Sequence, residues 1–260
     1  MEELVLTKED GVGILRINRA DKLNAMTTEM WDGFRALLAE IRDDDDIKVM
    51  VLTGTGRAFC AGSDVVKRLA ARIDAERSRQ ELLEQTGYNG LVLHGITKPI
   101  IGAINGTAAG AGLSLALLCD IRIASDQARF ASSWVKRGLI PDLGATWLLP
   151  RIVGMDNALE LMLTGDMIDA AEALRIGMVT RVVPNDDLMT VSLALAKKIA
   201  QGPTIAQNFI KRGAYRSLYN TLDEQLDFES YGQGVCRNTE DHKEGVASFM
   251  EKRPAVYRGR

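Results

Sequence analysis

The 260-residue chain is 46% apolar, which is enough to bury a full hydrophobic core in one large domain or in one domain with a helical appendage. Its formal net charge of -3 provides no excess of basic side chains for nucleic acid, and its three cysteines lack the CxxC spacing of a zinc site. No signal peptide or membrane span is visible, so we expect a cytoplasmic protein without a metal, membrane or nucleic-acid partner.

Apolar runs that predict strands alternate with amphipathic segments through the first 190 residues. An amphipathic helix is expected over 27–42 and a short apolar helix over 112–118. The predicted strands, in chain order, cover 13–18, 48–53, 99–104, 120–124 and 178–183. Alternation of this kind is typical of an α/β fold.

After about residue 190 the sequence shows helical periodicity only, without further strand patterns. The predicted helices cover 186–201, 203–218, 222–235 and 240–252. We therefore expect a core domain over 1–190, followed by a helical region over 191–260. Two segments of the core, 72–79 and 87–95, lack strand character and are interpreted as a mobile cover over a site.

Two glycine-rich segments each follow an apolar run: 59–64 comes after 49–52, and 105–112 comes after 100–104. Each pattern predicts a strand, a glycine turn and then a helix. A helix start leaves amide hydrogens unpaired and carries partial positive charge. Two such turns, aimed at one oxygen, would form an oxyanion hole that stabilises an enolate or a tetrahedral adduct.

A purely structural interpretation of these glycines is equally open. Gly62, Gly110 and Gly112 would then permit positive φ angles or tight packing of a strand against a helix. A nucleotide-binding loop is excluded, because Leu115 interrupts the GxGxxG pattern and no Gly-Lys-Ser/Thr follows either segment.

Asp142 is the acidic residue that stands out, because it lies in an apolar turn bounded by proline over 138–144. Loss of solvation in such surroundings raises a carboxyl pKa and makes the group a better proton acceptor near neutral pH. The alternative is that Asp142 caps a helix over 143–149, and both roles can hold together. His94 and His242 are too few for a histidine metal cluster or a hydrolase triad, and His94 is expected to cap a helix or lie at the surface.

A set of short motifs, spread over nearly the whole chain, resembles the crotonase or enoyl-CoA hydratase/isomerase superfamily. In chain order they are Asn18-Arg19, Leu23-Asn24-Ala25, Thr53-Gly54, Arg57-Ala58-Phe59-Cys60-Ala61-Gly62, Lys98-Pro99, Asn105-Gly106, Cys119-Asp120, Gly138-Leu139-Ile140-Pro141 and Leu163-Thr164-Gly165. The resemblance implies a crotonase-like spiral of ββα turns with a C-terminal helical region that forms trimers, often paired into hexamers. It also implies acyl-CoA thioester substrates, with coenzyme A as part of the substrate and no permanently bound cofactor.

The resemblance implies roles for individual residues as well. The amides of Ser63 and Ala111 would hold the thioester oxygen. Lys252 lies in the helical region and would reach the coenzyme A of a neighbouring protomer. The residues that the resemblance assigns to substrate and coenzyme A binding are Lys22, Leu23, Arg57, Ala61, Asp64, Val65, Gly110, Gly112, Trp134 and Lys252.

The chain also departs from the family pattern. Family hydratases carry two glutamates that orient water and deliver a proton, and these positions are Ser114 and Trp134 here. Asp142 stands where some family isomerases carry their single acidic residue, and the run 138–151 resembles the 1,2-epoxyphenylacetyl-CoA isomerase type most. Trp134 is interpreted as a wall of the acyl pocket, with plain core packing as the alternative.

A single carboxylate suffices for a 1,3-proton shift, in which Asp142 moves the proton while two amides hold the enolate. We therefore expect an acyl-CoA isomerase that shifts a double bond or rearranges an unsaturated or ring acyl group. The alternatives are an enoyl-CoA hydratase, a hydrolytic dehalogenase-like enzyme with Asp142 as nucleophile, and a non-catalytic acyl-CoA-binding relative. The dehalogenase branch carries a histidine near Gly87, which weakens that alternative.

Overall fold

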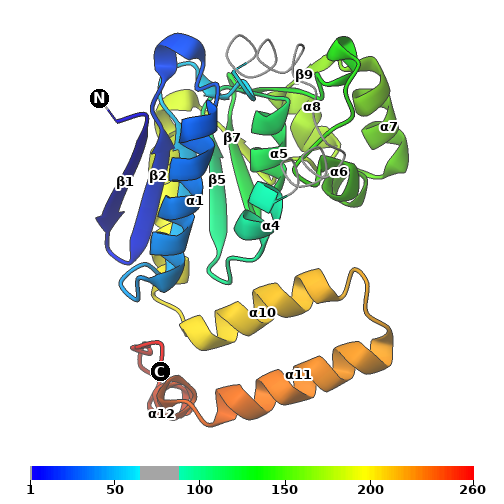
Figure 1. Ribbon diagram of the computed structural model, residues 1–260. Coiled ribbons are helices and arrows are strands. Elements are labelled where there is room, and N and C mark those ends of the chain that lie inside the picture. Colours follow the sequence, from blue (N-terminus) through cyan, green and yellow to red (C-terminus); the bar gives the residue numbers. More distant parts are fainter. Residues whose placement is uncertain (1, 65–87) are drawn as a thin grey trace.

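Two β-sheets form the centre of the molecule, and the computed structural model describes residues 2–64 and 88–260 of the chain (Figure 1). The expected cover over 72–79 lies outside the described residues, and 88–94 forms a helix. The first sheet has the strand order β1-β2-β3-β5-β7-β10, in which only β1 and β2 pair antiparallel. Its strands are β1 Leu4–Glu9, β2 Val12–Ile17, β3 Val49–Gly54, β5 Ile100–Ile104, β7 Ile121–Ser125 and β10 Arg181–Val183.

The second sheet consists of short strands in the order β4-β6-β8-β9. They are β4 Ala58–Cys60, β6 Thr107–Ala109, β8 Arg129–Ala131 and β9 Met167–Asp169, and only β9 pairs antiparallel. Each long strand β3, β5 and β7 of the first sheet is followed in the chain by a short strand of the second sheet, and then by helical structure. This repeat is the expected spiral of ββα turns, so the α/β fold class is confirmed.

The helices of the spiral cover the two sheets. They are α1 Thr28–Asp43, α4 Tyr88–His94, α5 Ala111–Leu117, α6 Ala145–Val153, α7 Met155–Thr164, α8 Ala170–Arg175 and α9 Leu188–Ala200, with short 3-10 helices η1 Ala20–Lys22, η3 Val135–Arg137 and η4 Asn185–Asp187. The start of α1 follows directly from sequence, because the Thr27 hydroxyl accepts a hydrogen bond from the Met30 amide. No helix in residues 2–64 and 88–260 combines the length and apolarity needed to cross a membrane.

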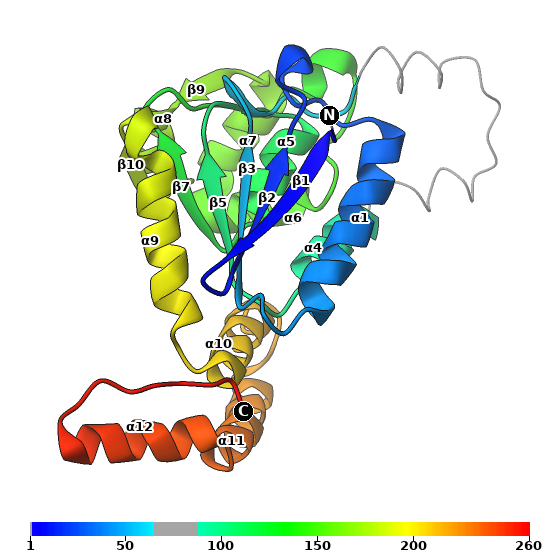
Figure 2. The same ribbon diagram turned by 90° about the vertical axis from the view of Figure 1, so that its left-hand side faces the viewer.

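Two apolar cores result from this arrangement. The larger core fills the space between the sheets and the helices α1, α5, α6 and α7. Phe34, Phe59 and Phe130 are among its buried side chains. The smaller core lies between the other face of the first sheet and α9 (Figure 2). The expected division at residue 190 therefore falls inside α9. The buried side chains of this helix, Leu188 and Ala196, pack against the first sheet. The two-part organisation itself stays a prediction.

Three helices follow α9 and lie beneath the spiral in Figures 1 and 2: α10 Thr204–Arg216, α11 Leu222–Arg237 and α12 Glu240–Glu251. Thr221 and Glu224 form a capping box at the start of α11. The segment after α12 folds back, because the buried carboxylate of Asp241 accepts hydrogen bonds from the amides of Arg258 and Gly259. These helices agree with the predicted ranges to within two residues at each end.

A polar cluster fixes α10 to the spiral. The Asp120 carboxylate receives the Tyr215 hydroxyl at 2.8 Å and pairs with the Lys211 ammonium at 2.8 Å. Lys211 also donates to the backbone oxygen of Lys98 at 3.0 Å. Burial and the neighbouring Asp120 charge raise the pKa of Tyr215, so its phenol stays protonated and donates to the carboxylate at neutral pH.

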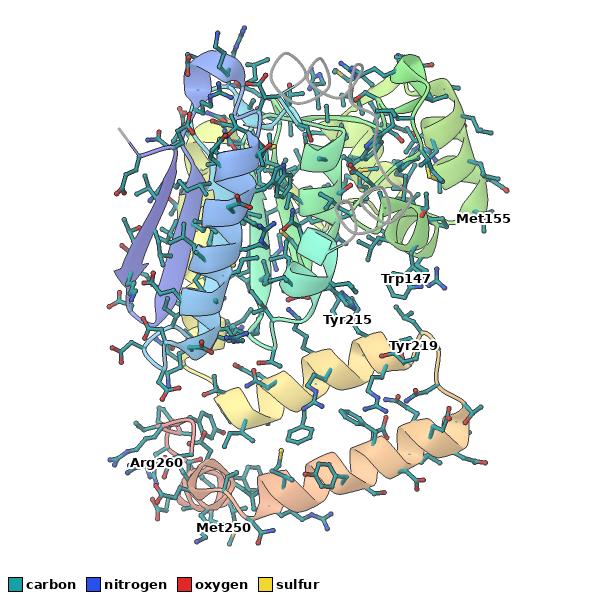
Figure 3. All side chains as sticks on the ribbon, in the orientation of Figure 1. Trp147, Met155, Tyr215, Tyr219, Met250 and Arg260 are labelled. Carbon is teal, nitrogen blue, oxygen red and sulfur yellow. The ribbon has the colours of Figure 1, made fainter. Side chains whose placement is uncertain are left out.

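His94, at the end of α4, lies at the interface between the spiral and α10. Its ring meets Tyr215 of α10 edge-on with centroids 4.6 Å apart, and Trp147 of α6 with centroids 5.9 Å apart. Figure 3 shows Trp147 reaching from α6 toward α10, and the Arg151 guanidinium stacks on that indole at 4.2 Å. The expected place of His94 at a helix end is confirmed, but its half-buried ring packs between two aromatic side chains instead of lying at the surface.

This environment makes acid stability depend on His94. Burial lowers the pKa of His94 below its ordinary value of 6.5, the Lys211 charge lowers it further, and Asp120 opposes the shift. At pH values between 6.5 and the lowered pKa, the unfolded chain therefore binds more protons than the folded one. Stability rises with pH in this range, and it is lost as the pH falls below 6.5 toward the lowered pKa. We expect the thermal midpoint to drop less between about pH 7.5 and about pH 5.5 in His94→Phe than in the parent protein. Equal drops in the two proteins would contradict this origin of acid sensitivity.

Candidate functional site

The two glycine segments meet in the structure. A β-carbon placed on Gly62, where φ is +100°, would lie 2.9 Å from the carbonyl oxygen of Ala109 and 3.3 Å from the amide nitrogen of Ala111. A β-carbon on Gly112 would lie 1.9 Å from the carbonyl oxygen of Cys60. The structural interpretation of these glycines is therefore supported, because they permit a close backbone contact between the two segments, whereas the oxyanion hole stays a prediction.

The Ala111 amide is the first of α5. Further along the helix, the amides of Leu113 and Ser114 donate to the Gly110 carbonyl at 2.8 Å and 3.2 Å. The Ala111 amide has no acceptor among the described residues, which is the ordinary state of a donor at a helix start. It is therefore available to an anionic oxygen outside the helix.

Ser63 presents its backbone from the other segment. It forms a parallel bridge with Met26, whose amide donates to the Gly62 carbonyl at 2.8 Å and whose carbonyl receives the Asp64 amide at 2.9 Å. In extended chain, successive peptide groups point to opposite sides. The Gly62 carbonyl points toward Met26, so the amide of the same peptide group, that of Ser63, points away from Met26, in the segment that approaches Ala111 through Gly62. The roles of Ser63 and Ala111 stay predictions that this geometry supports.

Asp142 lies beside α5. Its backbone carbonyl accepts the Ser114 hydroxyl at 2.9 Å and the Ala145 amide at 3.0 Å, and its carboxyl oxygen Oδ1 is shielded from solvent. α6 begins at Ala145 with Gly144 as its N-cap and without a side-chain cap. The capping interpretation of Asp142 is therefore wrong, because Leu143 at φ +52° and Gly144 at φ +87° separate its side chain from the helix start.

The two positions that differ from family hydratases are both buried. Ser114 is 0% exposed, and its hydroxyl is used on the Asp142 backbone. Trp134 is 6% exposed, and its carbonyl receives the amides of Arg137 and Leu139 at 2.8 Å and 3.1 Å. Neither side chain has an ionisable group that would replace a glutamate. The pocket-wall role of Trp134 stays a prediction, and its burial in the main core is equally compatible with packing.

Lys22 ends the 3-10 helix η1 and Leu23 is its C-cap, and this segment is attached to the first glycine segment by hydrogen bonds. The Ala61 amide donates to the Leu23 carbonyl at 3.0 Å. Asn24, fully buried, donates through its side-chain nitrogen to the carbonyls of Ala58 and Thr55 at 2.7 Å and 2.9 Å. Asn24 is a positioning residue that reasoning about candidate sites missed, although the Leu23-Asn24-Ala25 motif contained it.

Four candidates differ in their placement. Asp64 pairs with Arg19 at 2.8 Å, with each side chain only 12% exposed, so this carboxylate fastens the loop. Lys22 and Arg57 are exposed, as expected for residues that meet phosphate groups. Val65 lies outside the described residues.

Lys252 is not brought to this site within one chain. It ends α12 in a left-handed conformation at φ +54° and is exposed. Figures 1 and 2 place α12 at the opposite end of the molecule from η1 and the start of α5. A contact between Lys252 and bound coenzyme A therefore requires a second protomer and stays a prediction.

The thiols near the glycine segments are not set up as nucleophiles. Burial raises the pKa of Cys60 and of Cys119 to about 12, so both thiols are protonated at neutral pH. Within the described ranges, no three His, Cys, Asp or Glu side chains gather as a group able to hold a metal ion. Asp142 is an ionisable residue beside α5, since its backbone carbonyl accepts the Ser114 hydroxyl.

Sequence comparison agrees with the fold. A profile of the enoyl-CoA hydratase/isomerase family matches residues 7–260. The chain belongs to this family. It is thus an enzyme of the crotonase superfamily.

Relatives within the enoyl-CoA hydratase/isomerase family carry different activities. The 1,2-epoxyphenylacetyl-CoA isomerase of Escherichia coli is 39% identical over 100% of both chains. The short-chain-enoyl-CoA hydratase of Clostridium acetobutylicum is 36% identical over 97% of this chain and 96% of its own. The crystal structure of an enoyl-CoA hydratase/isomerase from Cupriavidus metallidurans, 32% identical, superposes with a TM-score of 0.92 over 100% of this chain and 97% of that one. Hydratase and isomerase names therefore occur at similar identity.

Proposed function

We propose that this chain is an acyl-CoA isomerase that shifts a double bond or rearranges an unsaturated or ring acyl-CoA through one carboxylate. The observation that carries the proposal is that Ser114 and Trp134 occupy the two positions of the hydratase glutamates, whereas Asp142 lies beside α5 with its backbone carbonyl on the Ser114 hydroxyl. The similarity to the 1,2-epoxyphenylacetyl-CoA isomerase of Escherichia coli supports the same choice.

The proposed reaction moves one proton and leaves the thioester intact. The Asp142 carboxylate removes a proton from the carbon beside the carbonyl or from the γ carbon, and the electrons move onto the thioester oxygen as an enolate. The amides of Ser63 and Ala111 donate to that oxygen. The protonated carboxyl then returns the proton to the other carbon, and the carbonyl re-forms. Each oxyanion donor contributes about 2.7 to 4 kcal/mol of transition-state stabilisation in comparable enzymes.

A panel of thioesters tests the proposal directly. The purified protein is assayed against enoyl-, dienoyl- and ring-epoxide-CoA substrates, and products are identified by mass and by the position of the double bond. Products of unchanged mass with a moved double bond or an expanded ring support the proposal. Products heavier by one water, as the main outcome, contradict it.

The second candidate is an enoyl-CoA hydratase, favoured by the Clostridium acetobutylicum relative at 36% identity. Hydration requires one group to orient water and one to deliver a proton to carbon, a task shared by two carboxylates in family hydratases. We expect crotonyl-CoA to be hydrated poorly or not at all, because Ser114 and Trp134 supply neither group. Hydration of crotonyl-CoA at about 10 per second, the median turnover for enzymes, would contradict the isomerase proposal.

We also propose that the protein binds coenzyme A only as part of its substrate and assembles as a homotrimer or a dimer of trimers. The helical region presents an apolar surface around a cavity of about 430 Å³ between α10, α12 and the last segment. Phe249 is 82% exposed and Met250 75% exposed on this surface. Exposure of this kind on a folded chain favours a protein partner. A cytoplasmic location stays a prediction.

Assembly is checked by light scattering after size-exclusion chromatography. The full-length protein is expected to elute as a trimer or hexamer. A chain truncated after Pro203 is expected to be a poorly soluble monomer, because α10 to α12 would be missing and the underside of the spiral near Lys98 and Asp120 would be exposed. A full-length monomer or a truncated trimer would contradict this assembly.

A further inference from the structure

The backbone of Asp142 is held from α5 by Ser114. This serine is 0% exposed, and its hydroxyl donates to the Asp142 carbonyl oxygen at 2.9 Å. Ser114 follows Ala111 by one turn of the same helix, and its own amide donates to the Gly110 carbonyl at 3.2 Å. One rigid turn therefore carries both the oxyanion amide and the donor that holds the base.

A second contact holds the same segment from α4. A β-carbon on Gly90 would lie 2.8 Å from the carbonyl oxygen of Leu143 and 3.2 Å from its α-carbon, so α4 touches the backbone directly. Leu143 adopts φ +52°, a left-handed conformation that is unfavourable for a leucine. Such a conformation persists where the surrounding structure determines it. Here α4 and α5 contact the turn at neighbouring residues.

We infer that Ser114 and Gly90 are positioning residues that hold Asp142 at a fixed place relative to the Ala111 amide. The inference rests on the proposed role of Asp142 as the base. Ser114 thus has its own role at a position where hydratases carry a glutamate. Its hydroxyl orients the turn that carries Asp142. Since a misplacement of about 1 Å costs on the order of 100-fold in rate, both contacts affect turnover without touching substrate.

The first experiment compares Ser114→Ala with Ser192→Ala. Ser192 is also 0% exposed, but its hydroxyl has no hydrogen-bond partner among the described residues. Turnover is measured per acyl-CoA site, with sites counted by calorimetric titration, so that loss of folded protein does not enter. We expect Ser114→Ala to lower kcat about 10- to 100-fold with KM within threefold, and Ser192→Ala to leave both unchanged.

Gly90→Ala is compared in the same way with Gly33→Ala. A β-carbon on Gly33, also in a helix, would meet only the Leu4 side chain at 3.5 Å. We expect Gly90→Ala to lower kcat per site about 10-fold or more, because Leu143 must shift. If Gly90→Ala does not fold, the Ser114→Ala result decides. A kcat per site within threefold of the parent in Ser114→Ala would overturn the inference.

A double variant separates positioning from general damage. In an Asp142→Asn background, Ser114→Ala is expected to cause no further loss, because the group that it positions is already gone. A further loss of fivefold or more would show that Ser114 acts elsewhere, and would overturn the inference. The proposed function fails on a different result, namely full turnover in Asp142→Asn alone.

Discussion

Asp142→Asn is expected to abolish isomerisation, with kcat lowered by at least about 100- to 10,000-fold, the usual contribution of a general acid or base. The amide has no titratable proton and cannot accept one from carbon, whereas its shape preserves the turn held by Ser114. Acyl-CoA binding, measured by calorimetry, is expected to stay within a few-fold because the oxyanion amides and the coenzyme A contacts lie on other segments.

The matched control is Asp166→Asn. Asp166 is 73% exposed, pairs with Lys136 at 3.2 Å on the surface, and undergoes the same loss of charge. We expect its turnover to equal that of the parent. Retained isomerisation in Asp142→Asn would show that another group moves the proton, whereas parallel losses of binding and turnover would assign Asp142 a structural role instead.

The outline of the fold was predictable because its long strands and helices carry strong periodic signals. The runs that became β3 and β5 are continuous and apolar, and α1 has a clear cap at Thr27. The short strands β4, β6, β8 and β9 were not predicted, since three residues are too few to show a period, and the six-residue strand β1 was missed as well. The predicted strand over 178–183 shrank to β10, because the Met178 amide turns back to the Ala173 carbonyl.

The candidate site was predictable where local chemistry was unusual. Glycine turns after apolar strands indicated the place where 59–64 and 105–112 meet, and an acid in an apolar turn indicated Asp142. The contacts that position Asp142 were not predictable, because Ser114 and Gly90 lie far from it in the chain and carry no periodic signal. A left-handed conformation cannot be predicted for a leucine from sequence. The prediction that Asp142 caps the following helix was therefore wrong, because Leu143 adopts this conformation.

Gly112→Ala is expected to damage the site more than any surface change, because its new β-carbon would lie 1.9 Å from the Cys60 oxygen and 2.6 Å from the Cys60 carbonyl carbon. Both of these atoms belong to backbone, and Cys60 itself is fully buried in β4, so no flexible side-chain end can move aside. The two glycine segments must therefore separate. Such a separation is expected to cost at least about 1 to 3 kcal/mol of stability by overpacking.

The same separation moves the amides of Ser63 and Ala111 apart, so that they would no longer meet one thioester oxygen as proposed. Loss of a single oxyanion donor costs about 100- to 1,000-fold in kcat, and we expect at least that loss per folded site. Thermal unfolding and turnover are measured beside Gly33→Ala, which makes the same chemical change where a β-carbon would meet only a side chain at 3.5 Å. An unchanged midpoint and turnover in Gly112→Ala would mean that the contact with Cys60 is not needed, and the meeting of the two segments would then not explain the oxyanion hole.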